Sequence, residues 1–240
     1  MSQSTSAGAR PKLLVACVGT ATEVGKTWVG ARTIEALRRR SIQVAARKPA
    51  ESFAVDGHEP LDSKVLAHTS GEPAEQVTPP QRRYAVALAP PMAAQRLGLA
   101  PPLIAELLVE LGWPSGCRVG WLETVGGVRS PVAADADSLG LCAAVDPDVV
   151  VLVGDASLGA IGAAVSAIDS ITLGAPALAD RTIVLMNRFD PDDDGHRENH
   201  RWLAEHLSQP VLTDIASLAN RLADAVERAD QTFGAPGGSA

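Results

Sequence analysis

The segment that most constrains this chain is a glycine-bounded loop, Gly19–Thr27, which joins two segments of different hydrophobic pattern. Leu13–Val18 is a continuous apolar run that predicts a buried strand, and Thr27–Arg39 has the amphipathic pattern of a helix. A strand, such a loop and a Gly-Lys-Thr helix start surround a phosphate chain with backbone N–H groups, and the helix N-terminus adds a partial positive charge. The segment therefore predicts nucleotide binding.

Two side chains and the distance in sequence between two glycines refine this prediction. Lys26 supplies a full positive charge to the phosphates, and the Thr27 hydroxyl is suited to a bound Mg²⁺ ion. Five residues separate Gly19 from Gly25, one more than in the general phosphate-binding loop. This insertion narrows the class of protein more than the Gly-Lys-Thr triplet does.

Apolar runs and amphipathic stretches alternate along the rest of the chain. Further strands are expected at Ile42–Arg47, Arg118–Glu123, Asp148–Val153, Arg181–Met186 and Val211–Ile215. Helices are expected at Trp28–Arg39, Leu61–Ser70, Pro91–Leu97, Pro102–Leu111, Ala160–Leu173, Gly195–Leu207 and Leu218–Ala229. This order predicts an α/β fold with a doubly wound, mostly parallel sheet of the P-loop NTPase type and helices on both faces.

Size and composition set the outer limits. The 240 residues are enough for one core, and we expect a single domain over residues 12–231, with a disordered arm at 1–11 and a disordered tail at 232–240. A net charge of −7 argues against a nucleic-acid surface, and no apolar run is long enough for a membrane span. The three cysteines show no metal or disulfide spacing, which fits a cytoplasmic protein.

Polar residues follow several expected strands, at the edge where ligands of such sheets bind. Lys48 follows the second strand and can point at the phosphate site, while Glu123 ends a strand where a metal-organising carboxylate belongs. Asp62 fits helix capping as well as metal binding, and both alternatives remain open. Asn187 and Arg188 follow a later strand, where the amide could contact a purine or serve only as a turn residue.

Two other patterns do not predict metal sites. Asp190–Gly195 has the composition of a calcium loop, but Arg201 stands where the twelfth-position acid should be, so we expect a solvated loop that caps the next helix. His196 and His200 lie four residues apart on that helix and are expected on its exposed face.

Taken together, these segments resemble the dethiobiotin synthetases. The loop ending Thr22–Thr27 is similar to that family's phosphate loop, and Lys48-Pro49 with Ser52 resembles its Lys-Pro-x-x-Ser segment. Further similar segments are Ala89–Ala94, Glu123–Gly127 with Pro131, Leu158–Ile161 and Asn187-Arg188. The resemblance runs in order over Leu13–Leu218.

The resemblance implies a homodimeric, ATP- and Mg²⁺-dependent ligase that carboxylates 7,8-diaminopelargonic acid with CO₂ and closes a ureido ring through a phosphorylated carbamate. It implies catalytic roles for Lys26 and Lys48. The implied ATP-binding residues are Glu23, Val24, Gly25, Lys26, Thr27, Trp28, Asp62, Glu123, Gly126, Asn187, Arg188, Ile215, Ala216 and Ser217. The implied substrate residues are Thr22, Ser52, Gly127 and Gly159, and the implied magnesium ligands are Thr27, Asp62 and Glu123.

The chain also departs from the family pattern, mainly on the acceptor side. Phe53, Val125 and Gly162 replace the usual glycine, alanine and asparagine, and Ala21, Pro91 and Ala216 are further departures. Three alternatives stay open: a related ligase acting on another amine or acid, of the cobyrinic acid amide synthetase type; an ATP-binding pseudoenzyme; and a regulatory module resembling the partitioning ATPases. The last of these carries a second lysine early in the loop, where this chain has Thr20 and Ala21.

Overall fold

The computed structural model describes residues 10–57 and 59–234. Their strands are β1 Leu13–Gly19, β2 Val44–Arg47, β3 Glu51–Ser52, β4 Arg83–Tyr84, β5 Val119–Gly127, β6 Val149–Asp155, β7 Thr182–Asn187 and β8 Val211–Leu212. Their helices are α1 Lys26–Arg39, α2 Asp62–Ser70, α3 Ala74–Val77, the 3₁₀ turn η1 Pro80–Arg82, α4 Pro90–Arg96, α5 Ile104–Glu110, α6 Ser138–Val145, α7 Ala160–Gly174, α8 Pro176–Ala179, α9 Asp194–His206 and α10 Ile215–Gly234.

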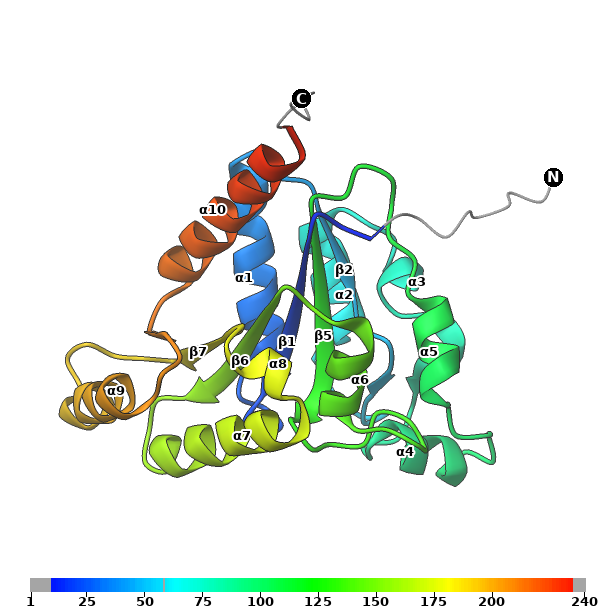
Figure 1. The fold of residues 1–240 in the computed structure, drawn as a ribbon. Coiled ribbons are helices and arrows are strands. Elements are labelled where there is room, and N and C mark those ends of the chain that lie inside the picture. The colour runs from blue at the N-terminus through cyan, green and yellow to red at the C-terminus, as the bar shows by residue number, and fades with distance from the viewer. Residues whose placement is uncertain (1–9, 58, 235–240) are drawn as a thin grey trace.

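The expected doubly wound α/β fold is confirmed. Six strands form one sheet in the order β2-β5-β1-β6-β7-β8, and every neighbouring pair is parallel (Figure 1). From β1 the chain crosses to β2 on one side, and from β5 it crosses to β6 on the other. Ligands of such sheets bind at the carboxyl end of the strand where the winding reverses, which here is β1. The phosphate loop follows this strand directly.

Alternate residues of the central strand face two different hydrophobic cores. Val15 and Cys17 of β1 pack in a cluster with the buried faces of α1, α2 and α10. Ala16 and Val18 pack in a second cluster with α6, α7 and α8 on the other side of the sheet. The two-residue period of a strand thus covers both sheet faces with helices, and the sheet is buried mainly by aliphatic side chains.

Several expected boundaries were wrong, each for a local reason. The strand expected at Val211–Ile215 ends at Leu212, because Asp214 accepts hydrogen bonds from the backbone N–H and hydroxyl of Ser217 and thereby caps α10. Glu123 does not end its strand: β5 continues to Gly127, with a register irregularity opposite Cys17 and Gly19 of β1. The Thr124 hydroxyl donates to the Cys17 carbonyl within this irregular stretch.

Short elements were missed altogether. Helices α3, α6 and α8 and the small parallel sheet of β3 and β4 have no counterpart among the expected elements. The expected arm at 1–11 and tail at 232–240 lie outside the described residues except at their inner ends. There, the Arg10 guanidinium donates to the carbonyls of Val145 and Asp146, and residues 232–234 belong to α10.

Candidate nucleotide site

Two glycines allow the phosphate loop its close approach to the sheet. A Cβ atom on Gly19 would lie 2.6 Å from the Ala21 carbonyl oxygen and 2.8 Å from that of Gly126. Gly25 has φ of +87° at the N-terminus of α1, and a Cβ atom there would lie 2.2 Å from Nδ2 of Asn187. Both positions therefore require glycine on steric grounds.

Lys26 begins α1 and points back into the loop. Its ammonium group donates to the carbonyl of Gly126 at 2.8 Å and to that of Ala21 at 3.4 Å. Burial lowers the pKa of Lys26 below its usual value, although the nearby Glu123 acts in the opposite direction. The amine is therefore held in place by neutral carbonyls. An anionic phosphate chain would form stronger hydrogen bonds with it than these carbonyls do.

A second group of side chains lies beside the loop and comes from four different segments. The Lys48 ammonium donates to Asp62 Oδ2 at 2.5 Å and to Glu123 Oε1 at 2.7 Å. The Thr27 hydroxyl donates to the same Glu123 oxygen at 2.8 Å. Thus the end of β2, the middle of β5 and the starts of α1 and α2 bring together four residues that sequence reasoning placed in the site.

Burial and charge oppose each other at this group. Burial disfavours the Lys48 ammonium, but Glu123 and Asp62 outweigh burial and raise the pKa of Lys48 above its usual value. The pKa of Asp62 is lowered, because Lys48 outweighs the opposing effect of burial. Lys48 is accordingly a positive charge at neutral pH, held by two carboxylates at the carboxyl edge of the sheet.

The donor set fits a magnesium ion. Glu123 is fully buried, and its Oε2 atom has no hydrogen-bond partner among the described residues. Mg²⁺ prefers oxygen ligands and is usually held by one or two carboxylates together with substrate phosphates and water. Glu123, Asp62 and Thr27 offer such a set, and no group of three or more His, Cys, Asp and Glu side chains suited to a metal occurs in the described ranges.

The end of β7 contacts the loop from its other side. Asn187 is buried, and its Nδ2 donates to the Val24 carbonyl at 2.9 Å. Arg188 donates to the Glu23 carbonyl at 2.9 Å and to Asp155 Oδ2 at 2.8 Å. The Ser157 hydroxyl and backbone, together with Arg188, hold the pKa of Asp155 at about 2, below its usual value of 3.8.

The shift of Asp155 predicts a pH-dependent contribution to stability. Because the folded-state pKa is lowered, the contribution is complete above about pH 4 and is lost as pH falls towards 2. Asp155 is 35% exposed, so we expect its size to stay below about 1 kcal/mol. Urea unfolding of the native protein and of Asp155→Asn should differ most at pH 6 and converge as pH falls towards 2. A constant difference would contradict the assignment.

One cavity of about 800 Å³ joins these groups. The expected site residues that line it are Thr22, Glu23, Gly25, Lys26, Thr27, Lys48, Ser52, Asp62, Glu123, Gly126 and Arg188. The lining residues not expected as site residues are Glu59, Ala87, Leu88, Ala89, Pro90, Val125 and Ser130. The Ala87–Pro90 stretch gave no chemical signal, and only Ala89 and Pro90 were marked, through the similarity of Ala89–Ala94 to a family segment.

Other expected site residues lie outside the residues that line this cavity. Val24 belongs to the loop, and its carbonyl accepts a hydrogen bond from the Asn187 side chain. Ile215, Ala216 and Ser217 form the first turn of α10. Trp28 is half-exposed with the Arg32 guanidinium 5.9 Å from its ring. Gly127 pairs with Gly19 in the sheet, and Gly159 is the exposed N-cap residue of α7.

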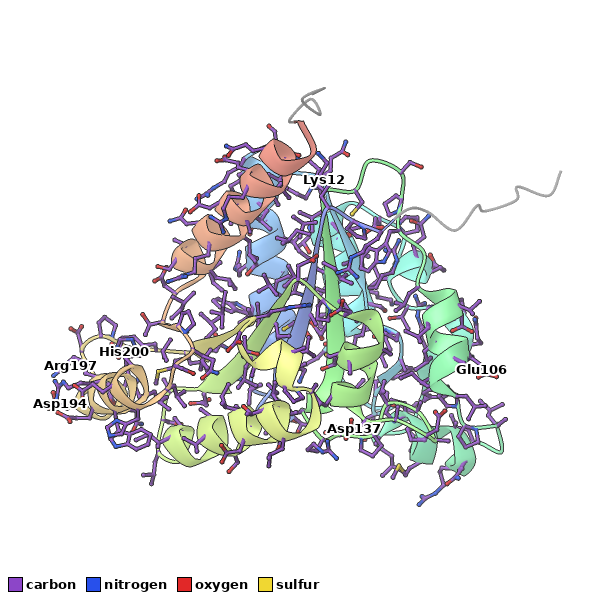
Figure 2. All side chains as sticks on the ribbon, in the orientation of Figure 1. Lys12, Glu106, Asp137, Asp194, Arg197 and His200 are labelled. Carbon is purple, nitrogen blue, oxygen red and sulfur yellow. The ribbon has the colours of Figure 1, made fainter. Side chains whose placement is uncertain are left out.

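Charged side chains are also frequent away from the cavity (Figure 2). Lys12 lies at the opposite end of β1, where it pairs with Asp230. On α9, His200 packs edge-on against Phe189, and the Asp193 carboxylate accepts from the His196 backbone N–H as the helix cap. These contacts agree with the expected capping loop. The expectation of an exposed face was wrong for both histidines, because His196 and His200 are half-buried and both pack against Phe189.

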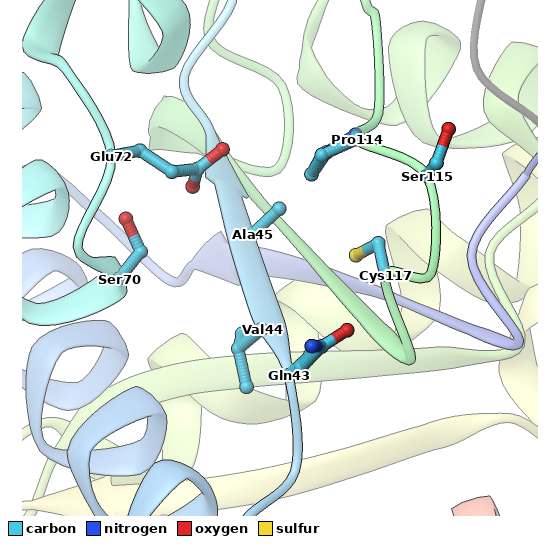
Figure 3. A pocket seen from close by; sticks show the side chains of 8 residues that line it. All are labelled: Gln43, Val44, Ala45, Ser70, Glu72, Pro114, Ser115 and Cys117. Atoms are coloured by element: carbon cyan, nitrogen blue, oxygen red, sulfur yellow. The ribbon is translucent and has the colours of Figure 1, made fainter.

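A second, smaller cavity of about 230 Å³ lies beside β2 (Figure 3). Its lining includes Cys117 and Glu72, but none of the expected site residues. Glu72 is already used by the Ala46 backbone N–H and the Arg47 guanidinium, and burial raises the pKa of the Cys117 thiol. The larger cavity is therefore the candidate site.

A parallel sheet with a glycine-bounded loop, a lysine and a threonine at the start of the following helix defines a P-loop nucleotide-binding protein. A DUF1611 family protein from Anabaena variabilis has a similar fold: the TM-score is 0.51 at 15% identity, covering 91% of this chain and 58% of that one. No protein-family model matches the chain. No helix in the described part is long and apolar enough to cross a membrane.

Sequence relatives narrow this class to one family. The ATP-dependent dethiobiotin synthetase BioD of Phenylobacterium zucineum is 32% identical over 196 residues, which are 78% of this chain and 82% of the relative. The protein of the same name from Caulobacter vibrioides is 32% identical over 178 residues, 73% of this chain and 80% of the relative. The chain belongs to the dethiobiotin synthetase family.

Proposed function

We propose that this protein is a cytoplasmic ATP- and Mg²⁺-dependent dethiobiotin synthetase that acts on 7,8-diaminopelargonic acid and CO₂ or bicarbonate. The observation that carries the proposal is the Lys48 ammonium, which lies between Asp62 and Glu123 beside the phosphate loop in one cavity. A phosphoryl transfer to a carbamate needs positive charge and alignment rather than a covalent nucleophile. This site supplies both.

In this proposal the chain's own residues act as follows. The loop amides and Lys26 bind the phosphates of ATP, and Lys48 stabilises the carbamate and the transferring phosphoryl group. Thr27, Asp62 and Glu123 hold magnesium, which when bound neutralises charge on the phosphates. Thr22 and Ser52 face the diamine side of the cavity.

The proposed reaction has three steps. One amine adds to CO₂ to form a carbamate with loss of a proton, and the carbamate oxygen then takes the γ-phosphoryl group of ATP and releases ADP. The second amine attacks the carbamate carbon and loses a proton, the bond from that carbon to the phosphate oxygen breaks, and phosphate leaves as the ring closes. We assign the adenine side to Asn187 and the Ile215–Ser217 turn, and Arg188 to the ATP site beside the phosphate loop. We include a homodimer in the proposal, with the substrate carboxylate bound near Gly159.

Mass analysis tests this reaction directly. With [¹³C]bicarbonate, ATP, Mg²⁺ and the diamine, dethiobiotin should form with one added mass unit, and omission of the diamine should abolish it. Formation of ADP and phosphate without labelled dethiobiotin would contradict the proposed acceptor.

A second candidate, an ATP-dependent ligase for another amine or acid, is favoured by the cavity wall itself. Ala87, Leu88, Ala89, Pro90 and Val125 contribute apolar side chains to the lining. Gly162 on α7 also lacks the amide donor that the family offers to a carboxylate. Either acceptor would use the same phosphate and metal residues, so the two candidates differ only in the product.

Replacing Gly162 with Asn should improve use of the diamine if this segment binds the substrate carboxylate. Gly162 is exposed and a Cβ atom there would meet nothing within 4 Å, so the fold can accept the change. A regained hydrogen bond to a carboxylate would lower KM for the diamine about tenfold. Steady-state kinetics measure this, with Gly112→Asn, at a similarly open position, as the control. An unchanged KM would count against the carboxylate pocket.

A further inference from the structure

Two consecutive residues at the end of β7 hold two consecutive carbonyls of the phosphate loop. Asn187 Nδ2 donates to Val24 O, and Arg188 donates to Glu23 O, both at 2.9 Å. Because a trans peptide directs its N–H opposite to its C=O, these bonds turn the N–H groups of Val24 and Gly25 away from β7. The end of β7 therefore determines the direction of loop amides.

The loop needs such support because its conformation is unfavourable without it. Glu23 has φ of +60°, in the left-handed region that side-chain-bearing residues rarely adopt. Arg188 has φ of +57°, so both partners of this contact are held in the same uncommon conformation. Non-glycine residues in that region persist where surrounding contacts fix them, often at ligand-binding segments.

Asp155, at the end of β6, fixes the direction of the arginine. Its Oδ2 accepts from Arg188 at 2.8 Å, while its Oδ1 accepts from the Ser157 hydroxyl and backbone N–H. Arg188 lines the nucleotide cavity, whereas Asp155 is not among the residues that line it. Asp155 therefore reaches the cavity lining through its hydrogen bond to Arg188.

We propose that Arg188, directed by Asp155, is a positioning residue that holds the phosphate loop in its phosphate-binding conformation through the Glu23 carbonyl. The inference rests on the nucleotide site of the proposed function and does not depend on the acceptor. It predicts that Arg188 and Asp155 strengthen binding of the ligand's phosphate chain and do not affect binding of its nucleoside.

Calorimetric titration of the full chain with ADP and with adenosine tests this. Asp155→Asn keeps an oxygen for Ser157 but loses the charge that directs Arg188, and we expect ADP affinity to fall about tenfold. Arg188→Met should weaken ADP binding by a similar factor, and the double variant by no more than either single one. Adenosine affinity should stay unchanged in all three.

The chain offers a matched control at the other end of the same two strands. Arg181, just before β7, donates to Asp146 at 2.7 Å and to the Pro147 carbonyl at 3.0 Å, so Arg181→Met removes an equivalent exposed pair far from the loop. Its ADP affinity should equal that of the native protein.

Three results would overturn the inference, and they are distinguishable. If Arg188 acts on the nucleotide itself, Arg188→Met weakens ADP binding but Asp155→Asn does not. If the pair is only structural, ADP and adenosine affinities fall together, or ADP affinity is unchanged while stability falls. If the native protein binds no ADP, the nucleotide site of the proposed function fails as well.

Discussion

Replacing Lys26 with alanine is expected to lower ATP-dependent phosphate release by about 10²–10³-fold, because the charge that stabilises the transferring phosphoryl group is lost. Lys26 is buried, and within the described part of the chain its amine donates only to backbone carbonyls, so no buried carboxylate loses its sole partner. The fold should therefore persist. Initial rates of phosphate release at saturating diamine and ATP measure the effect.

The control for this experiment is Lys64→Ala. Lys64 is an exposed residue of α2, and its removal changes the net charge by the same amount without touching the cavity. We expect its rate to match that of the native protein. Unchanged turnover in Lys26→Ala would remove the assignment of this loop to the phosphate chain.

Replacing Glu123 with Gln is expected to lower the free energy of unfolding by about 3 kcal/mol, because it leaves the buried Lys48 ammonium with Asp62 as its remaining carboxylate partner. Glu123 is completely buried and Lys48 nearly so, which makes the lost interaction costly. The double variant Glu123→Gln with Lys48→Met should recover most of this loss, since the buried ammonium is gone and Asp62, which loses its partner, is 43% exposed to solvent. Urea unfolding of the native protein, of Glu123→Gln and of the double variant measures these free energies.

An exposed pair provides the comparison. Glu35 pairs with Arg39 on the surface of α1, and Glu35→Gln should change the unfolding free energy by less than about 0.5 kcal/mol. Equal stability of Glu123→Gln and the double variant would contradict the coupling between Lys48 and Glu123. Both Glu123 variants should lose phosphate release, because they also lose a proposed magnesium ligand.

The sequence predicted the fold well where one local signal was strong. The apolar run of β1 and the Gly-Lys-Thr triplet predicted a strand, a loop and a helix, and the structure has all three. Lys48 and Glu123 were expected together because the ends of parallel strands meet at one edge. They do contact each other, but Glu123 lies within β5 and not at its end, so the strand-end argument holds only for Lys48.

Other features depend on contacts that a linear pattern does not contain. The continuation of β5 beyond Glu123 depends on pairing with β1, and the Asn187 amide is directed by the loop carbonyl that it meets across the fold. Short elements such as α3 are fixed by packing and not by their own propensity. The apolar cavity wall at Ala87–Pro90 likewise arises only when the chain is folded.

The most direct test of this account is phosphate release from ATP with Mg²⁺ and bicarbonate, measured with and without 7,8-diaminopelargonic acid. The account predicts strong stimulation by the diamine, with one phosphate released for each dethiobiotin formed. Tight ATP binding without any stimulation by the diamine would contradict it, and would mean that the phosphate and metal residues serve a different acceptor.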